Sequence, residues 1–122
     1  MNKQHITPRV IELAKKLYEA GYRQEIQEGD WYLDRSLMDR LICSDQNLTQ
    51  ENQTKDFIPI PSLIQALDWL EEKGLIEFYF LKCKREEKHN WILRADLYPE
   101  IKAQSKLEAC LSAMLKVMGK EE

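Results

Sequence analysis

Histidine, the side chain most often used for proton transfer near neutral pH, is scarce in this sequence. The chain has 2 histidines, His5 near the N-terminus and His89 in a charged stretch between two expected strands. Neither belongs to a recognisable nucleophile or metal motif, and the carboxylates Asp30, Asp34 and Asp39 are spaced too loosely to indicate a metal site. We therefore predict no catalytic residue, no metal site and no cofactor, and expect that the protein is not an enzyme.

Paired cysteines and long apolar runs are also missing. The 3 cysteines, Cys43, Cys83 and Cys110, form no CxxC pair, so their spacing indicates neither a zinc site nor a redox dithiol. No apolar run approaches the roughly 18 residues that cross a bilayer, and the N-terminal segment lacks the apolar core of a secretion signal. We expect a cytoplasmic protein with reduced thiols and no membrane partner.

A strong charge of either sign is absent as well. The chain has 18 basic and 21 acidic residues and a formal net charge of −3, so no overall field attracts a polyanion. The most basic stretch, residues 82–88 (KCKREEK), is typical of a solvated turn between two strands. Nucleic-acid binding is therefore not favoured.

Three segments have the apolar spacing of amphipathic helices. The first begins after Thr7 and ends at Gly21, the second covers residues 61–73, and the third begins after Ser105, with Glu108 in capping-box spacing. In the second helix, the sequence predicts one buried stripe made of Leu63, Ile64, Leu67 and Leu70.

Strand-like patterns occupy much of the remaining sequence. Residues 75–83 (LIEFYFLKC) and 90–96 (NWILRAD) are expected to form an antiparallel hairpin. The first is apolar on both faces, which is typical of a central strand, whereas the second has a partly polar face, as at a sheet edge. Residues 31–34 (WYLD) also have strand character. Residues 35–43 fit either a helical turn or a strand, and we favour a strand over Leu41 to Cys43.

This order of elements predicts an α+β fold, with a small antiparallel sheet of about three or four strands covered by three helices. The length favours a single domain over residues 1–122. Residues 57–62 (FIPIPS) are expected to approach the second helix as extended chain, and residues 98–99 to end the hairpin's second strand. Residues 44–56 contain one aliphatic side chain, Leu48, and are expected to form an exposed, mobile polar loop.

Large aromatic side chains are numerous for so short a chain, and such residues dominate both cores and interfaces. We expect Trp69 and Trp91 to pack in the core. Trp31 and Tyr32 lie beside a polar turn and are therefore predicted to form an exposed contact surface for a protein partner.

A DNA-binding module is the alternative, because helix 61–73 followed by hairpin 75–96 has the order of elements in a winged helix. The residues that would contact nucleic acid in this alternative are Gln65, Lys73, Lys84 and Arg85. The exposed face of the same helix would also carry Asp68, Glu71 and Glu72, which repel phosphate. The charges therefore favour a protein partner over DNA.

Four segments carry a resemblance to known sequences: KLYEAGY (16–22), GDWYLD (29–34), FIPIPSLIQALDWLEEKG (57–74) and SKLEACLSAMLK (105–116). Through them, the chain resembles a loose group of small uncharacterised proteins from phages and Bacteroides-type gut bacteria. The resemblance implies a small α+β domain of prophage origin, with residues 44–56 as an insertion, and it implies no catalytic residue. Together with the absent site chemistry and the surplus aromatics, it leads us to expect a non-enzymatic, cytoplasmic interaction or accessory domain that acts on a host or phage protein.

Overall fold

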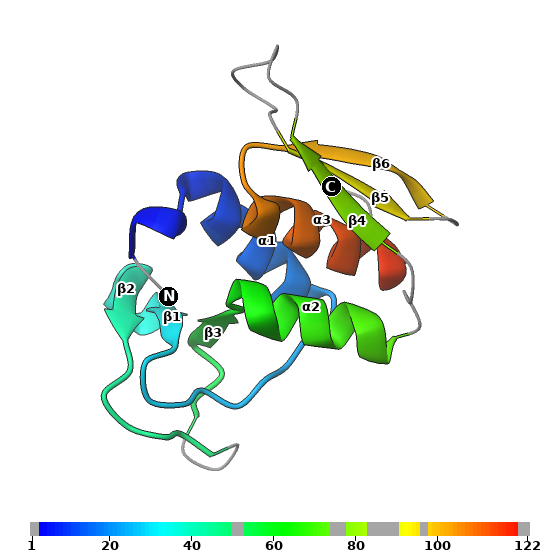
Figure 1. Cartoon of the computed structure of the whole chain (residues 1–122). Helices are drawn as coiled ribbons and strands as arrows, with labels where there is room; N and C mark the ends of the chain where they lie inside the picture. The colour runs from blue at the N-terminus through cyan, green and yellow to red at the C-terminus, as the bar shows by residue number, and fades with distance from the viewer. Residues whose placement is uncertain (1–2, 50–52, 74–77, 83–90, 96–97, 120–122) are drawn as a thin grey trace. The chain divides into compact units, whose positions relative to one another are not determined.

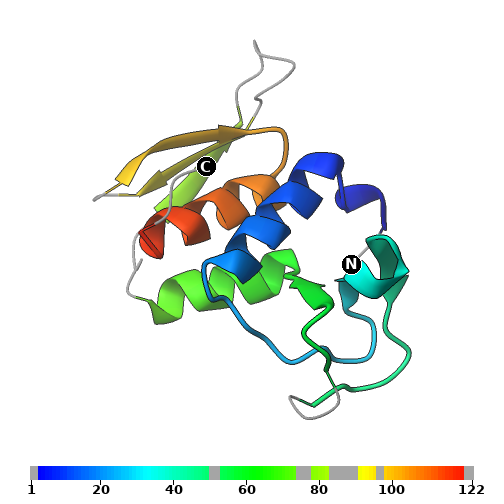
Figure 2. The same cartoon turned by 180° about the vertical axis from the view of Figure 1, so that it is seen from behind.

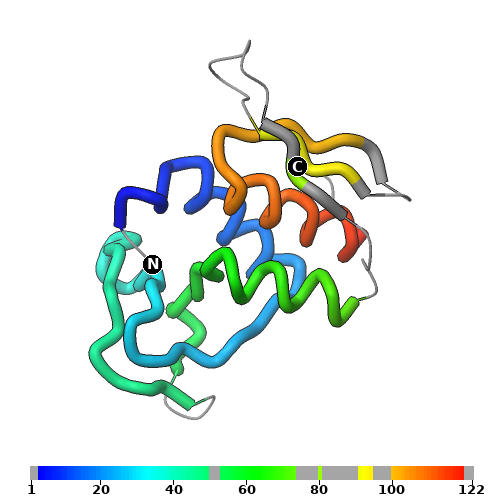
Figure 3. Tube along the Cα trace, in the orientation of Figure 1, coloured from blue at the N-terminus to red at the C-terminus, as the bar shows by residue number. Residues whose placement is uncertain are grey.

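The structure is a computed structural model that describes residues 3–49, 53–73, 78–82, 91–95 and 98–119 (Figure 1). The chain divides into two compact units, Met1–Ser62 and Leu63–Glu122, which we call the N-terminal unit and the C-terminal unit. Figure 3 traces both along the chain, with the residues outside the description in grey. The single domain over residues 1–122 stays a prediction.

The N-terminal unit contains a helix and a three-stranded antiparallel sheet. Its elements are a short 3-10 helix η1 (Lys3–His5), α1 (Pro8–Glu19), β1 (Trp31–Asp34), a 3-10 turn η2 (Arg35–Leu37), β2 (Arg40–Cys43) and β3 (Phe57–Ile60). The strand order is β2-β1-β3, so β1 is central. The strand predicted over residues 41–43 is confirmed, since β2 pairs with β1 over its whole length.

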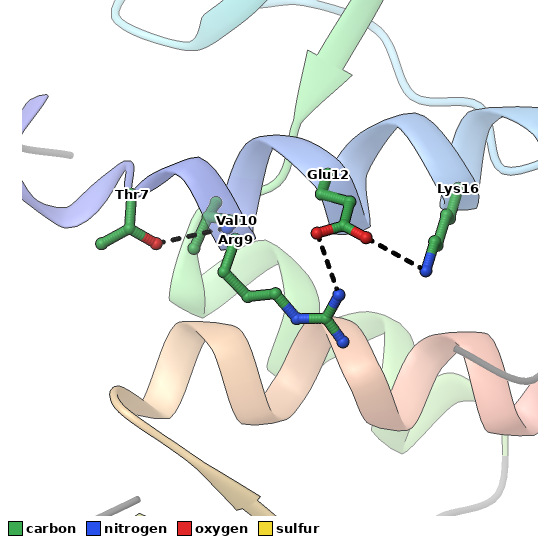
Figure 4. A network of polar contacts seen from close by, with 5 residues as sticks. All are labelled: Thr7, Arg9, Val10, Glu12 and Lys16. Carbon is green, nitrogen blue, oxygen red and sulfur yellow. Dashed lines mark hydrogen bonds and ion pairs between the residues drawn. The ribbon is translucent and has the colours of Figure 1, made fainter. Parts of the chain in front are cut away.

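Local side-chain chemistry places the start of α1 where the sequence predicts it (Figure 4). Thr7 Oγ1 accepts a hydrogen bond from the backbone N–H of Val10 at 3.2 Å, which satisfies one of the donors left open at a helix start. On the exposed side, the Glu12 carboxylate lies 3.1 Å from Arg9 and 3.3 Å from Lys16. The hydrogen bond from Arg9 and, to a smaller extent, the one from Lys16 lower the pKa of Glu12.

The central strand β1 has a buried face on each side. Leu33 lies between its partners Leu41 and Ile58, and α1, which contacts β3, buries its own apolar stripe (Val10, Leu13, Ala14 and Leu17). Tyr32 belongs to the opposite face. There it forms a cluster with Ile26 and Leu48, against which Ile42 and Phe57 also pack.

Because of that cluster, residues 44–49 are less exposed than the sequence predicts. Leu48 is buried, and its backbone N–H donates to the carbonyl of Ile26 at 2.6 Å. Ser44 is also buried, and its N–H donates to Asp30 O at 2.8 Å. The expectation of a wholly exposed loop is therefore wrong at both positions, whereas the mobility of residues 44–56 stays a prediction.

Strand β3 contains Pro59, which lies in a segment that the sequence predicts only as extended chain. Pro59 pairs with Tyr32 at the outer strand of the sheet. Arg35 N donates to Asp56 O at 2.9 Å and Ser44 N donates to Asp30 O, so the odd-numbered residues of β1 bond toward β3 and the even-numbered ones toward β2. Pro59 therefore faces a residue that bonds elsewhere, and the missing N–H costs no ladder hydrogen bond.

The C-terminal unit contains α2 (Leu63–Glu72), β4 (Phe78–Lys82), β5 (Trp91–Ala95), β6 (Tyr98–Ala103) and α3 (Lys106–Val117). Its strands form an antiparallel sheet in the order β4-β5-β6. The hairpin is confirmed, but its two strands exchange the expected places: β5 is central and β4 lies at an edge of the described sheet. The reason is β6, because residues 98–103 continue as a third strand where the sequence predicted an end.

Helix α3 is the buried element of the C-terminal unit, in contact with α2, β5 and β6. Ser105 Oγ accepts from Glu108 N at 3.1 Å, so the predicted Ser105 cap is confirmed. The Glu108 carboxylate accepts from Gln104 N at 3.4 Å, one residue before the N–H that a capping box would use. Figure 2 shows the helices of the unit from behind. In α2, Ala66 and Leu70 are buried, but Ile64 is 71% exposed, because it lies about 200° around the helix from Ala66. The predicted stripe is wrong at Ile64.

The α+β class with antiparallel pairing and three α-helices is thus confirmed for the described residues. The strands lie in two sheets of three strands each, where the sequence predicted one sheet of about three or four.

Candidate functional site

The predicted contact pair, Trp31 and Tyr32, does not form one surface. The two side chains lie on opposite faces of β1, because consecutive residues of a strand alternate. Tyr32 is only 8% exposed, and its ring centroid is 4.7 Å from that of Phe57. Burial, followed by the charge of Asp34, raises the pKa of Tyr32. The expectation that Tyr32 is exposed is wrong, while Trp31 is half-buried.

The residues of the nucleic-acid alternative are only partly described. Gln65 is half-buried in α2. Lys73 is exposed, with Nζ 5.8 Å from the ring centroid of Trp69. Lys84 and Arg85 lie outside the described residues. The exposed positions at the end of α2 are otherwise acidic, namely Asp68, Glu71 and Glu72.

An exposed apolar turn, which no sequence pattern indicates, connects β1 to β2. Leu37 is 50% exposed and Met38 is 95% exposed. Met38 has φ 57° and ψ 45°, and Asp39 has φ 60°, so two consecutive residues with side chains adopt the left-handed conformation that usually requires glycine. We call residues Leu37–Asp39 the tip.

Specific polar contacts hold the tip on both sides. Before it, the buried Asp34 carboxylate accepts hydrogen bonds from Ser36 N at 3.0 Å and from Ser36 Oγ at 2.5 Å. After it, Asp39 Oδ2 lies 2.6 Å from Nζ of Lys15 on α1. The tip is therefore a defined turn, whose two apolar side chains are presented to solvent by polar anchors.

The remaining chemistry-bearing residues form no reactive centre in the part of the chain that the structure describes. No three His, Cys, Asp or Glu side chains gather there as metal ligands, and no described helix is both long and apolar enough to cross a membrane. Cys43 is exposed. Cys110 is buried in α3, and this burial raises its pKa to about 12, so its thiol is protonated near neutral pH.

Comparisons with protein-family models, with curated proteins and with solved structures found no match to this chain. Support for a function of the candidate site therefore comes from the geometry of this chain.

Proposed function

We propose that the protein is a non-enzymatic interaction domain and that the tip is its point of contact with a protein partner. The observation that carries this proposal is Met38, an apolar side chain that is almost fully exposed on a left-handed backbone. A non-glycine residue in this conformation costs roughly 1–2 kcal/mol. Conformations with such a cost persist where the surrounding structure holds them, and they cluster at functional sites.

The chemistry of the tip suits insertion into an apolar pocket on the partner. A methionine side chain is unbranched and polarisable, so it adapts to irregular apolar surfaces. Methionine is enriched at protein interfaces, where a few anchoring side chains supply much of the binding energy. Leu37 would add a second apolar contact beside Met38. A cytoplasmic location and a phage or Bacteroides-type origin belong to the same proposal, supported by composition and by the resemblance described above.

Site-specific photocrosslinking tests the tip. A benzophenone amino acid replaces Met38 in one variant and Ile64 in a matched control, since Ile64 is also apolar and exposed at 71% but lies in α2. After irradiation in an extract of the native cells, we expect a discrete protein adduct from position 38 and a much weaker one from position 64. Excess unlabelled protein should suppress the adduct, whereas excess Met38→Gly protein should not.

Met38→Gly is the informative competitor because glycine relieves the left-handed strain, so this variant is expected to keep or slightly raise the free energy of unfolding. A loss of binding in it then cannot result from unfolding. Three outcomes would contradict the proposal. They are equal adducts from positions 38 and 64, suppression of the position-38 adduct by excess Met38→Gly protein, and turnover of a small molecule by the purified protein.

For the nucleic-acid alternative, we expect no retardation of duplex DNA in a gel-shift experiment at low salt. The described face of α2 presents Asp68, Glu71 and Glu72, and like charges oppose approach to phosphate. Retardation that weakens with added salt and disappears in a Lys84→Ala, Arg85→Ala double variant would establish the winged-helix alternative instead.

A further inference from the structure

Two arginine side chains converge on one tyrosine ring in the N-terminal unit. The Cζ atom of Arg23 lies 3.8 Å from the centroid of the Tyr18 ring, and that of Arg35 lies 5.4 Å from the same centroid. Arg23 follows α1, and Arg35 begins the turn η2 that leads to the tip. Two cations are therefore held beside one aromatic ring, although self-repulsion opposes such a pair in the absence of an anion.

Hydrogen bonds to backbone carbonyls fix both guanidinium groups. Arg23 Nη1 donates to Tyr18 O at 2.8 Å and to Tyr22 O at 2.7 Å. Arg35 Nη2 donates to Lys55 O at 2.7 Å, and Tyr18 Oη donates to the same oxygen at 3.0 Å. These contacts use one terminal nitrogen of each arginine, so Nε and the other terminal nitrogen of each remain as donors.

Within the described residues, neither Arg23 nor Arg35 forms an ion pair with a carboxylate. Between described residues of the N-terminal unit, ion pairs join Glu12 to Arg9 and Lys16, and Asp39 to Lys15. The closest acidic neighbour of Arg35 in sequence, Asp34, uses its carboxylate on Ser36. Both arginines are exposed, so a ligand can reach them.

We infer that Tyr18, Arg23 and Arg35 form a binding site for a phosphate monoester. Two planar guanidinium forks match the three oxygens and the charge of about −1.5 to −2 that such a group carries at neutral pH. A carboxylate carries only one charge and two oxygens, and a phosphodiester carries only one charge. Both therefore match the two guanidinium forks less well than a phosphate monoester does. The carbonyl contacts pre-organise the forks, which lowers the ordering entropy that binding requires.

The position of Arg35 suggests where the phosphate comes from. Arg35 and the tip belong to the same connection between β1 and β2, with only Ser36 between Arg35 and Leu37. A protein partner whose apolar pocket receives Met38 can therefore present a phosphorylated side chain to Arg35 and Arg23. This assignment of the source, a phosphorylated protein partner, rests on the proposed function, whereas the anion site itself does not.

Titration of the full chain with phenyl phosphate, followed by NMR of the arginine Nε–H groups, tests the anion site. We expect saturable shifts at Arg23 and Arg35, and binding at least tenfold weaker for benzoate. Binding should also weaken below about pH 6, where the monoester dianion takes up a proton and its charge falls toward −1. Arg23→Lys and Arg35→Lys should each weaken binding about tenfold, because lysine keeps the charge but loses the fork.

Arg40→Lys is the matched control, since Arg40 is an exposed arginine on β2 of the same unit. The affinity of this variant for phenyl phosphate should be unchanged. Thermal unfolding checks that each variant is folded. Equal weakening in Arg40→Lys, non-saturable shifts, or benzoate binding as tight as phenyl phosphate would overturn the site. The site would also be overturned if single-stranded DNA bound more tightly than phenyl phosphate at equal phosphate concentration. The ligand would then be the backbone of a nucleic acid.

A degenerate library of peptides with a central phosphoserine, phosphothreonine or phosphotyrosine tests the source. We expect enrichment of peptides that bind at least tenfold more tightly than phenyl phosphate. If no peptide exceeds phenyl phosphate, the phosphoprotein source is wrong. The two proposals can fail separately. If the adduct from position 38 persists in the Arg23→Lys variant, the interaction function stands, but the partner does not bind through a phosphate at this site.

Discussion

Replacing Leu33 by alanine is expected to lower the free energy of unfolding by about 2–5 kcal/mol. Leu33 is 1% exposed in the central strand β1, between Leu41 and Ile58. Truncation removes buried apolar surface and leaves a cavity that a close-packed sheet cannot fill by small movements. Urea unfolding followed by far-UV circular dichroism measures the change.

The matched control is Leu37→Ala, which makes the same change four residues later at a side chain that is 50% exposed. Its effect should stay within about 0.5 kcal/mol, because the removed atoms are largely in water before and after unfolding. Equal losses for the two variants would mean that β1 is not the centre of the N-terminal unit's core.

Alkaline pH is the second condition with a large expected effect. Burial raises the pKa of the Cys110 thiol from 9.0 to about 12, with a smaller opposing effect from Lys106. Between these values, the unfolded chain has lost the thiol proton while the folded chain retains it, so the free energy of unfolding falls as pH rises. From about pH 8 to about pH 10.5, we expect a loss of about 2 kcal/mol from this group.

Unfolding in urea at the two pH values measures this loss, and Cys110→Ala is the variant that isolates it. Alanine is small and apolar and has no proton to lose, so the alkaline loss should shrink by about 2 kcal/mol in this variant. Burial also raises the pKa of Tyr22 above its ordinary value of 10.0, so Tyr22→Phe should remove a further part of the loss above that pH. An unchanged pH dependence in Cys110→Ala would contradict a buried thiol.

The helix boundaries could be predicted because short-range chemistry determines them. Thr7 and Ser105 are each hydrogen-bonded to the backbone N–H three residues later, and that spacing can be read directly from the sequence. Apolar periodicity likewise predicted α1 and α3. Sheet neighbours depend on partners distant in the chain, which periodicity does not specify. For this reason, the hairpin was predicted, but the central position of β5 was not.

The candidate site could not be predicted for a similar reason. The left-handed backbone of Met38 has no glycine to indicate it, and Arg23 and Arg35 meet at Tyr18 only after β1 brings η2 back to α1. Tyr32 was misplaced because the sequence shows a polar turn beside it, and not the Ile26 and Leu48 side chains that cover it in the fold.

Pro59 also affects what happens at the rim of the N-terminal sheet. A proline on an outer strand offers no amide hydrogen there, so an incoming strand from another molecule would lack a donor at the middle of the rim. Natural sheets use this device to prevent edge-to-edge aggregation. The residue that lets β3 end the sheet thereby also discourages the sheet from growing into a fibril.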